Sequence, residues 1–152
     1  MTKAVWGPAT WKLLHCMVLK VDTIEPSQLI ELKNAIMGIV SNLPCPYCTS
    51  HALSNIASSN FKVINNINDL KLFFFQFHNK VNQQVNKPLI TYEQHLPIYC
   101  DLNLETVLND MLTIYQKQIG GVTMMLYGFH RKQMLINLVN YFRRNRNLYV
   151  KG

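Results

Sequence analysis

The sequence predicts an all-α fold, and three observations lead to this expectation. In six segments, apolar residues recur three and four positions apart, which gathers them on one face of a helix. No segment alternates apolar and polar residues over the length of a β-strand. Prolines and clusters of serine and asparagine separate the periodic segments. With 152 residues, 49% of them hydrophobic, the chain is long enough to bury a core of its own.

A proline starts each of the first three predicted helices, because the first turn of a helix does not use the N–H that proline lacks. We expect these helices to begin at Pro8, Pro26 and Pro46. The third extends to Ala57. The stripes of the first two are Trp11, Leu14, Val18 and Leu19, then Leu29, Leu32, Ile36, Ile39, Val40 and Leu43.

A fourth helix follows the polar turn at residues 65–69 and ends before Pro88. Its stripe is Leu70, Phe73, Phe74, Phe77, Val81 and Val85. Beside this stripe lie His78, Asn79 and Asn82. Asparagine is unfavourable inside a helix because its side chain competes for backbone hydrogen bonds. Two asparagines in these turns therefore indicate that their amides have a ligand.

Beyond the fourth helix we expect an irregular segment over residues 91–103. A fifth periodic segment runs from Leu104 to Tyr115 and is closed by Gly120-Gly121. The last predicted helix covers residues 131–144, with Met134, Leu135, Leu138, Val139 and Phe142 on one side.

The positive charge is confined to the C-terminal segment. Through Asp110, eight lysines balance eight acidic residues, whereas no Asp or Glu follows and seven cations supply the net charge of +7. This basic segment can bind an acidic partner, nucleic acid or a membrane surface. Its apolar stripe can also pack on the core with the arginines solvated, and we expect packing.

No run of residues is long and apolar enough for a membrane span, and residues 1–6 lack the apolar region of a signal peptide. We therefore expect a soluble, cytoplasmic protein. Four cysteines are too few for a disulfide scaffold.

The motif Cys45-Pro46-Tyr47-Cys48 indicates redox chemistry or metal binding. At a helix N-terminus, free N–H groups stabilise a thiolate, which is the species that attacks disulfides. Glutaredoxin-like folds place this motif after a strand, but here a helical segment precedes it. Zinc could be held by Cys45, Cys48, His51 and His78, but the two histidines are too far apart in sequence for a usual ligand pair. We expect no metal site.

Three motifs together resemble the Erv/ALR family of FAD-linked sulfhydryl oxidases. They are the segment Trp6-Gly7-Pro8-Ala9-Thr10-Trp11-Lys12-Leu13-Leu14-His15, the Cys45–Cys48 motif with His51, and His78-Asn79-Lys80-Val81-Asn82 leading to Lys87-Pro88. The resemblance covers residues 1–100. It implies a four-helix bundle plus a short fifth helix as the FAD-binding domain, leaving residues 101–152 as a basic C-terminal helical extension.

The resemblance also implies roles for individual residues. Cys45 accepts electrons from a substrate dithiol through a mixed disulfide, and Cys48 passes them to FAD, which O₂ reoxidises with release of hydrogen peroxide. The residues expected to hold FAD are Gly7, Trp11, His15, Tyr47, Cys48, His51, His78, Asn79, Val81, Asn82 and Lys87. Relatives are commonly homodimers built on the first two helices, so the resemblance implies a homodimer.

Three departures from the family pattern shape the remaining expectations. Phe75 and Tyr92 stand where cellular relatives have a structural disulfide. Lys3 is the residue nearest to the position at which many relatives carry an arginine, shortly before the first tryptophan. No shuttle cysteine pair is present, because Cys16 and Cys100 are single, and a bridge between these two stays open.

Without a shuttle pair, direct oxidation of a thioredoxin-like partner is expected. The minimal core resembles the versions encoded by large DNA viruses, which would place the protein in the host cytoplasm or the virion. The alternative is a non-enzymatic helical adaptor that binds an acidic partner through its basic C-terminal segment. A zinc ion could stabilise such an adaptor.

Overall fold

The computed structural model describes residues 2–117 and 125–149, with the backbone alone for residues 125–127. Within these ranges all regular structure is helical, which confirms the predicted all-α fold. The α-helices are α1 (Lys3–Leu19), α2 (Pro26–Val40), α3 (Pro46–Ala57), α4 (Ile67–Gln84), α5 (Tyr92–Cys100), α6 (Leu104–Lys117) and α7 (Met125–Arg144). Two short 3₁₀ helices, η1 (Phe61–Val63) and η2 (Arg146–Tyr149), complete the set.

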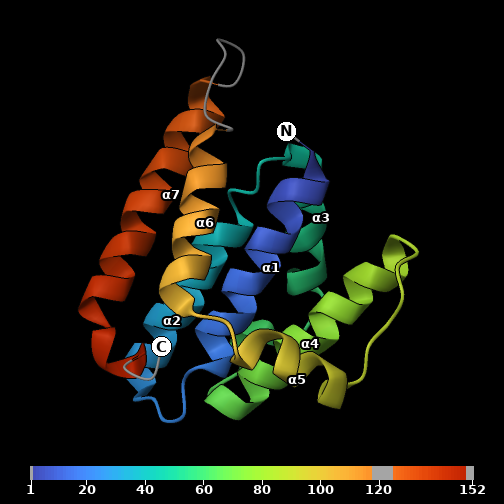
Figure 1. Ribbon diagram of the computed structural model, residues 1–152, viewed down its shortest axis with the longest axis vertical. Helices are drawn as coiled ribbons and strands as arrows, with labels where there is room; N and C mark the ends of the chain where they lie inside the picture. The colour runs from blue at the N-terminus through green and yellow to red at the C-terminus, as the bar shows by residue number, and fades with distance from the viewer. Residues whose placement is uncertain (1, 118–124, 150–152) are drawn as a thin grey trace.

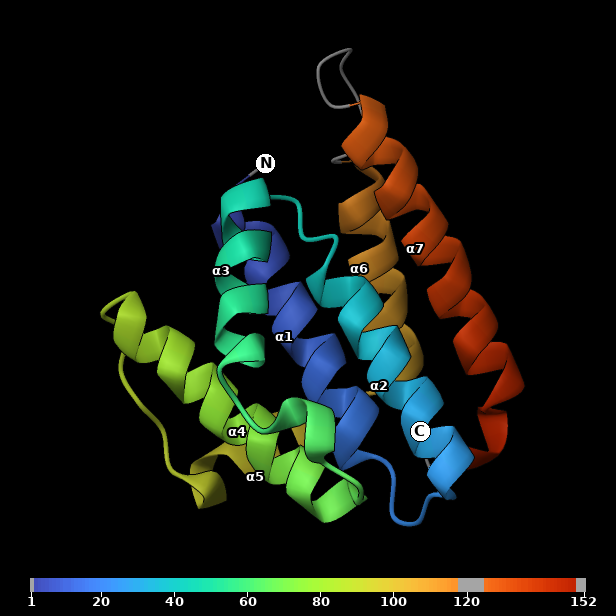
Figure 2. The same ribbon diagram turned by 180° about the vertical axis from the view of Figure 1, so that it is seen from behind.

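Helix α1 is the centre of the molecule. Figures 1 and 2 show it with α3 and α4 on one side and α6 on the other. From Leu13 to Leu19 every side chain is buried, because α4, α5 and α6 all pack against this helix. A helix that is apolar all round needs neighbours on every side, and here the packing provides them.

Helix α1 begins at Lys3, five residues before the predicted start at Pro8. Proline inside a helix removes one hydrogen bond to the carbonyl four residues earlier, which here belongs to Ala4. Ala4 and Pro8 are both exposed, so this carbonyl remains open to water. The prediction was wrong because an exposed proline near a helix start costs too little to end the helix.

Residues 91–103 are not irregular, as the pattern had suggested. Residues 92–100 form α5, the short fifth helix that the family resemblance implied. Thr91 caps it: its hydroxyl accepts the N–H of Gln94, and the Gln94 side chain accepts the N–H of Thr91. This reciprocal capping box starts the helix, which continues through Pro97.

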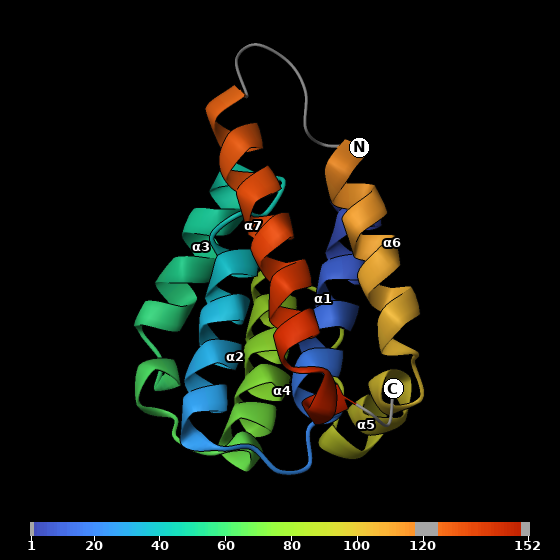
Figure 3. The ribbon, with the colours of Figure 1, turned by 90° about the vertical axis from the view of Figure 1, so that its left-hand side faces the viewer.

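The C-terminal helices α6 and α7 pack on the first two helices (Figure 3). Helix α6 lies on α1, where the hydroxyls of Thr10 and Tyr115 are 2.7 Å apart. Helix α7 lies on α2, and its Met134, Leu135 and Leu138 are buried in the common core. The expected packing of the apolar stripe is therefore confirmed. Helix α7 starts at residue 125, before the predicted residue 131, and Gly120-Gly121 lies outside the described residues.

Candidate functional site

The Cys45–Cys48 motif forms the start of α3. Pro46 is the first helical residue and Cys45 is the N-cap, with its sulfur accepting the backbone N–H of Cys48 at 3.2 Å. The motif therefore places one sulfur at the positive end of a helix, as the sequence predicted. Both thiols are free and half-buried.

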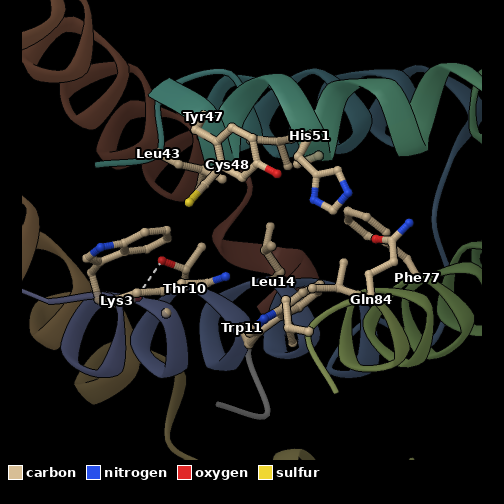
Figure 4. Close-up of a pocket in the computed structure, with 16 residues that line it drawn as sticks. Lys3, Thr10, Trp11, Leu14, Leu43, Tyr47, Cys48, His51, Phe77 and Gln84 are labelled. Atoms are coloured by element: carbon tan, nitrogen blue, oxygen red, sulfur yellow. Dashed lines mark hydrogen bonds between the residues drawn. The ribbon is translucent and has the colours of Figure 1, made fainter. Parts of the chain in front are cut away.

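A cavity of about 410 Å³ lies between α1, α3 and α4, and the Cys48 side chain forms part of its wall while Cys45 does not. Figure 4 shows Tyr47, Cys48 and His51 on the α3 side, facing Thr10, Trp11 and Leu14 of α1. Phe77 of α4 lies at one end of this cavity, and Leu43 lies beside the cysteine. Its volume falls within the range of small-molecule sites, and aromatic rings and aliphatic side chains form most of its surface.

The two cysteines have different environments. Burial, followed by the hydrogen bond and charge of Cys45, raises the pKa of the Cys48 thiol to about 11. Lys3 acts in the opposite direction and lowers this pKa. Cys48 is therefore held as a thiol, and the Lys3 ammonium is the cation available to its thiolate.

The residues predicted to hold the cofactor fall into two groups. Those that line the cavity are Gly7, Trp11, Tyr47, Cys48, His51 and Val81. Those that do not are His15, His78, Asn79, Asn82 and Lys87. Tyr47 and His51 stack with their ring centroids 6.1 Å apart, and Tyr47 remains 78% exposed.

Trp11 joins the cavity to a cluster of three histidines. Its indole stacks on the His78 ring, with centroids 3.9 Å apart. His78 Nδ1 and His15 Nε2 lie 2.9 Å apart, and His15 Nδ1 and His95 Nε2 lie 3.1 Å apart. These are hydrogen bonds that link α4, α1 and α5. Tyr99 stacks on His15 from α5 with a centroid distance of 4.1 Å.

All three histidines are held in the neutral form. Burial is the main cause of the lowered pKa of each, and for His78 the value falls to about 4. The charges of His95 and Lys87 add to the effect at His78. The cluster therefore supplies imidazole N–H donors and acceptors rather than cations.

The polar residues of α4 position the chain that leaves it. The Asn79 side chain donates to the Ile90 carbonyl at 2.8 Å and accepts the Ile90 N–H at 3.2 Å. Asn86 has a φ of 59°, and the Lys87 N–H donates to the Asn82 carbonyl at 2.8 Å. This is a Schellman cap, and it places Lys87 near enough to lower the pKa of His78.

The sequence analysis missed two residues of this region, His95 and Tyr99, because it treated their segment as irregular. His95 is only 1% exposed and contacts His15 directly. The signal that could have found both is the capping box of Thr91 and Gln94. It predicts a helix in which His95 and Tyr99, four positions apart, share a face.

Phe75 and Tyr92, where the family resemblance led us to expect no disulfide, are in contact. Their rings meet edge to face with centroids 5.3 Å apart, and His95 packs on both. An aromatic contact thus joins α4 to α5 at this point. Among the described residues, no group of three or more His, Cys, Asp or Glu side chains is arranged so that it could hold a metal ion.

Comparison with known proteins gives the family. The sequence model of the Erv1/Alr family matches residues 8–99, which include the cysteine motif, the histidine cluster and most of the residues that line the cavity. The chain belongs to the Erv1/Alr family. This Erv1/Alr protein is 33% identical over 103 residues to the FAD-linked sulfhydryl oxidase of African swine fever virus, isolate Tick/Malawi, covering 67% of this chain and 86% of that protein.

Two further relatives are also viral. The FAD-linked sulfhydryl oxidase of the isolate Pig/Kenya is 32% identical over the same length, again covering 67% of this chain and 86% of that protein. A protein of invertebrate iridescent virus 3, provisionally named for the same activity, is 35% identical over 88 residues, covering 55% of this chain and 58% of that protein. No solved structure matches the chain. None of the described helices is long and apolar enough to cross a membrane.

Proposed function

We propose that this Erv1/Alr protein forms disulfide bonds in partner proteins, with Cys45 and Cys48 as the catalytic residues. It is a flavin-linked thiol oxidase whose cofactor is FAD, as its family and the names of its relatives indicate. The observation that carries the proposal is the Cys48 side chain in the wall of the cavity, with the Cys45 sulfur at the adjoining helix N-terminus.

The residues of the cavity suit a flavin. Trp11, Tyr47 and Phe77 supply aromatic surfaces for a planar ring system, and Lys3 supplies a cation for its electron-rich edge. We infer that Gly7, His51 and Val81 complete this part of the site. We infer that the rest of the cofactor is held on the Trp11 side of the cavity, by His15, His78, Asn79, Asn82 and Lys87. The chemistry supplied by FAD when bound is acceptance of the electron pair and its transfer to O₂, giving hydrogen peroxide.

The cysteine pair exchanges disulfides in two steps. A substrate thiolate attacks the Cys45 sulfur of the Cys45–Cys48 disulfide, forming a mixed disulfide and releasing the Cys48 thiolate. The second substrate thiolate attacks the substrate sulfur of this mixed disulfide, which releases Cys45 and leaves the substrate oxidised. The N–H of Cys48 stabilises the departing Cys45 sulfur, and Lys3 stabilises the Cys48 thiolate.

The partner we propose is a thioredoxin-like protein with a reduced cysteine pair, oxidised directly in the host cytoplasm or the virion. Cys45 lies outside the cavity wall, whereas Cys48 lies within it. This division suits an outer sulfur that meets a protein and an inner one that meets the cofactor. The resemblance implies a homodimer built on the first two helices, whereas the packing of α6 and α7 on these helices favours a monomer.

A visible absorption spectrum of the purified protein tests the proposal. We expect a flavin spectrum with about one FAD per chain, bleached by dithiothreitol without air and restored by air. A colourless protein that also fails to take up added FAD would overturn the assignment.

Two cysteine variants test the relay within that experiment. Cys48→Ser should keep the flavin spectrum but lose dithiothreitol oxidation by at least about a hundredfold, because no sulfur adjoins the cofactor cavity. Cys100→Ser is the matched control, since Cys100 is exposed and lies outside the cavity; it should oxidise dithiothreitol at the wild-type rate. Wild-type turnover by the Cys48 variant would contradict the relay.

A further inference from the structure

The outer side of the C-terminal helices carries a groove of about 520 Å³, separate from the cysteine site. Its apolar side chains are Leu112 of α6 and Leu135, Ile136 and Val139 of α7. Ile136 is 47% exposed although it lies among these residues. We call this the α6–α7 groove. Figure 3 shows its two helices side by side.

Helix α7 carries two seams of residues at helix-packing spacing, an inner apolar one and an outer one that mixes apolar and basic side chains. Its inner seam, which includes Leu135 and Leu138, is buried against the core. Its outer seam consists of Phe129, Lys132, Ile136, Val139 and Arg143, separated by three, four, three and four residues. This alternation is the spacing by which one helix packs along another. Phe129 is 64% exposed, so a large apolar residue on this seam lacks cover.

The two cations of the outer seam border the groove. Lys132 and Arg143 are eleven residues apart, which is about 16 Å along the helix. Neither forms an ion pair within the described residues, where the salt bridge of α7 joins Arg144 to Glu31. Asp110 is the acidic residue of α6 that is closest in sequence to the groove residue Leu112. It lines a different hollow, together with Val5 and Pro8. No acidic residue follows Asp110 in the chain.

We infer that the α6–α7 groove binds an amphipathic helix of a partner protein, with acidic residues about three turns apart flanking its apolar face. A concave groove between two helices accepts a third helix, with apolar anchors in the groove and charge complementarity at its ends. A membrane surface is flat and would not reach Leu112 and Leu135 between the helices. A second copy placed groove to groove would bring basic seams together, which is repulsive.

The test uses the full chain and two designed peptides of about 18 residues, labelled for fluorescence anisotropy. Both repeat leucine at alternating three- and four-residue spacing. The acidic peptide places glutamates beside this seam, and the basic peptide has lysines at the same positions. We expect the acidic peptide to bind at least about tenfold more tightly, with its affinity falling as salt is raised.

Charge reversal separates this groove from general attraction to a basic protein. Lys132→Glu with Arg143→Glu should weaken the acidic peptide at least about tenfold and strengthen the basic one. Lys62→Glu with Lys80→Glu changes the net charge equally at exposed positions elsewhere and should leave both affinities unchanged. Ile136→Ser should weaken the acidic peptide without altering its salt dependence.

Three results would overturn the inference: no binding of the acidic peptide, equal effects of the two charge-reversal pairs, or binding to phosphatidylserine vesicles that the peptide does not compete away. Circular dichroism checks that each variant is folded. Because anisotropy reports binding alone, the result does not depend on FAD or on thiol oxidation. Failure of the groove and failure of the proposed enzyme are therefore separate outcomes.

Discussion

Cys45 and Cys48 differ because one caps a helix and the other lies against a cavity. The Cys45 sulfur accepts a backbone N–H, whereas burial raises the pKa of Cys48 to about 11. The release of Cys48 as a thiolate is therefore the unfavourable part of the exchange. Lys3 offsets it, since its charge lowers the same pKa. At this scale, the position of one lysine tunes the reactivity of the pair.

Replacing this lysine gives a prediction. Lys3→Met should raise the pKa of Cys48 further and slow dithiothreitol oxidation about three- to tenfold near neutral pH, since one pKa unit corresponds to a factor of ten. Lys3→Arg keeps the charge and should stay close to wild type. An oxygen electrode measures both rates. Equal rates for Lys3→Met and wild type would exclude an electrostatic role for Lys3.

The histidine cluster shows how a helix-to-helix junction depends on protonation. His15, His78 and His95 join α1, α4 and α5 through two hydrogen bonds. Each has a pKa below 6.5 in the folded chain, mainly because of burial. The unfolded chain therefore binds protons near pH 6.5 that the folded chain does not bind.

Stability should accordingly fall as the pH is lowered from 7 to 5. The sign follows because the unfolded state takes up more protons, with a slope of up to about 1.4 kcal/mol per pH unit for each proton. The loss of stability that His78 causes stops growing once the pH falls below about 4, because the folded state is then protonated as well. Urea unfolding at several pH values measures the slope. His95→Gln should reduce it, and a slope unchanged by this substitution would contradict the cluster's role.

Helix α5 brings His95 and Tyr99 to this junction, and its capping box offers a test. Thr91→Ala should lower the free energy of unfolding by about 1 kcal/mol, because the Gln94 N–H loses its acceptor. Thr113→Ala, on an exposed interior turn of α6, is the control and should be neutral or slightly stabilising. Urea denaturation compares the two. A cost at Thr113 equal to that at Thr91 would argue against the cap.

Most helices and the cysteine site could be predicted from local sequence. Helix α5 was missed although its capping box is a local signal, and the histidine contacts could not be predicted. Apolar periodicity located α2, α4 and α6, and Pro46 located the start of α3. The misjudged points were two prolines, Pro8 and Pro97, each the sixth residue of its helix. Proline weakens a helix locally, but burial of the same helix outweighs that cost. That His15 contacts His95 depends on tertiary packing between residues eighty positions apart, which local patterns do not contain.

At the scale of the whole molecule, the C-terminal helices are part of one core with the family region. The Tyr149 hydroxyl donates to the Met17 carbonyl at 2.9 Å and lies 2.8 Å from the Tyr141 hydroxyl. With the Thr10–Tyr115 contact, these bonds join both ends of the C-terminal segment to α1. Residues 101–152 were predicted as a separate extension, and their described part covers surfaces of α1 and α2.

This coverage bears on the expected homodimer. The resemblance implies pairing through the first two helices, but here α6 packs on α1 and α7 on α2. Undocking them would expose Met111, Leu135 and Leu138, each worth about 1.5–3 kcal/mol when buried. Pairing through α1 and α2 would have to repay that cost, so we expect the full chain to be monomeric. Light scattering after size-exclusion chromatography should give a mass near 17.7 kDa. Twice this mass, persisting on dilution, would show that the chain pairs through another surface or that the C-terminal helices undock.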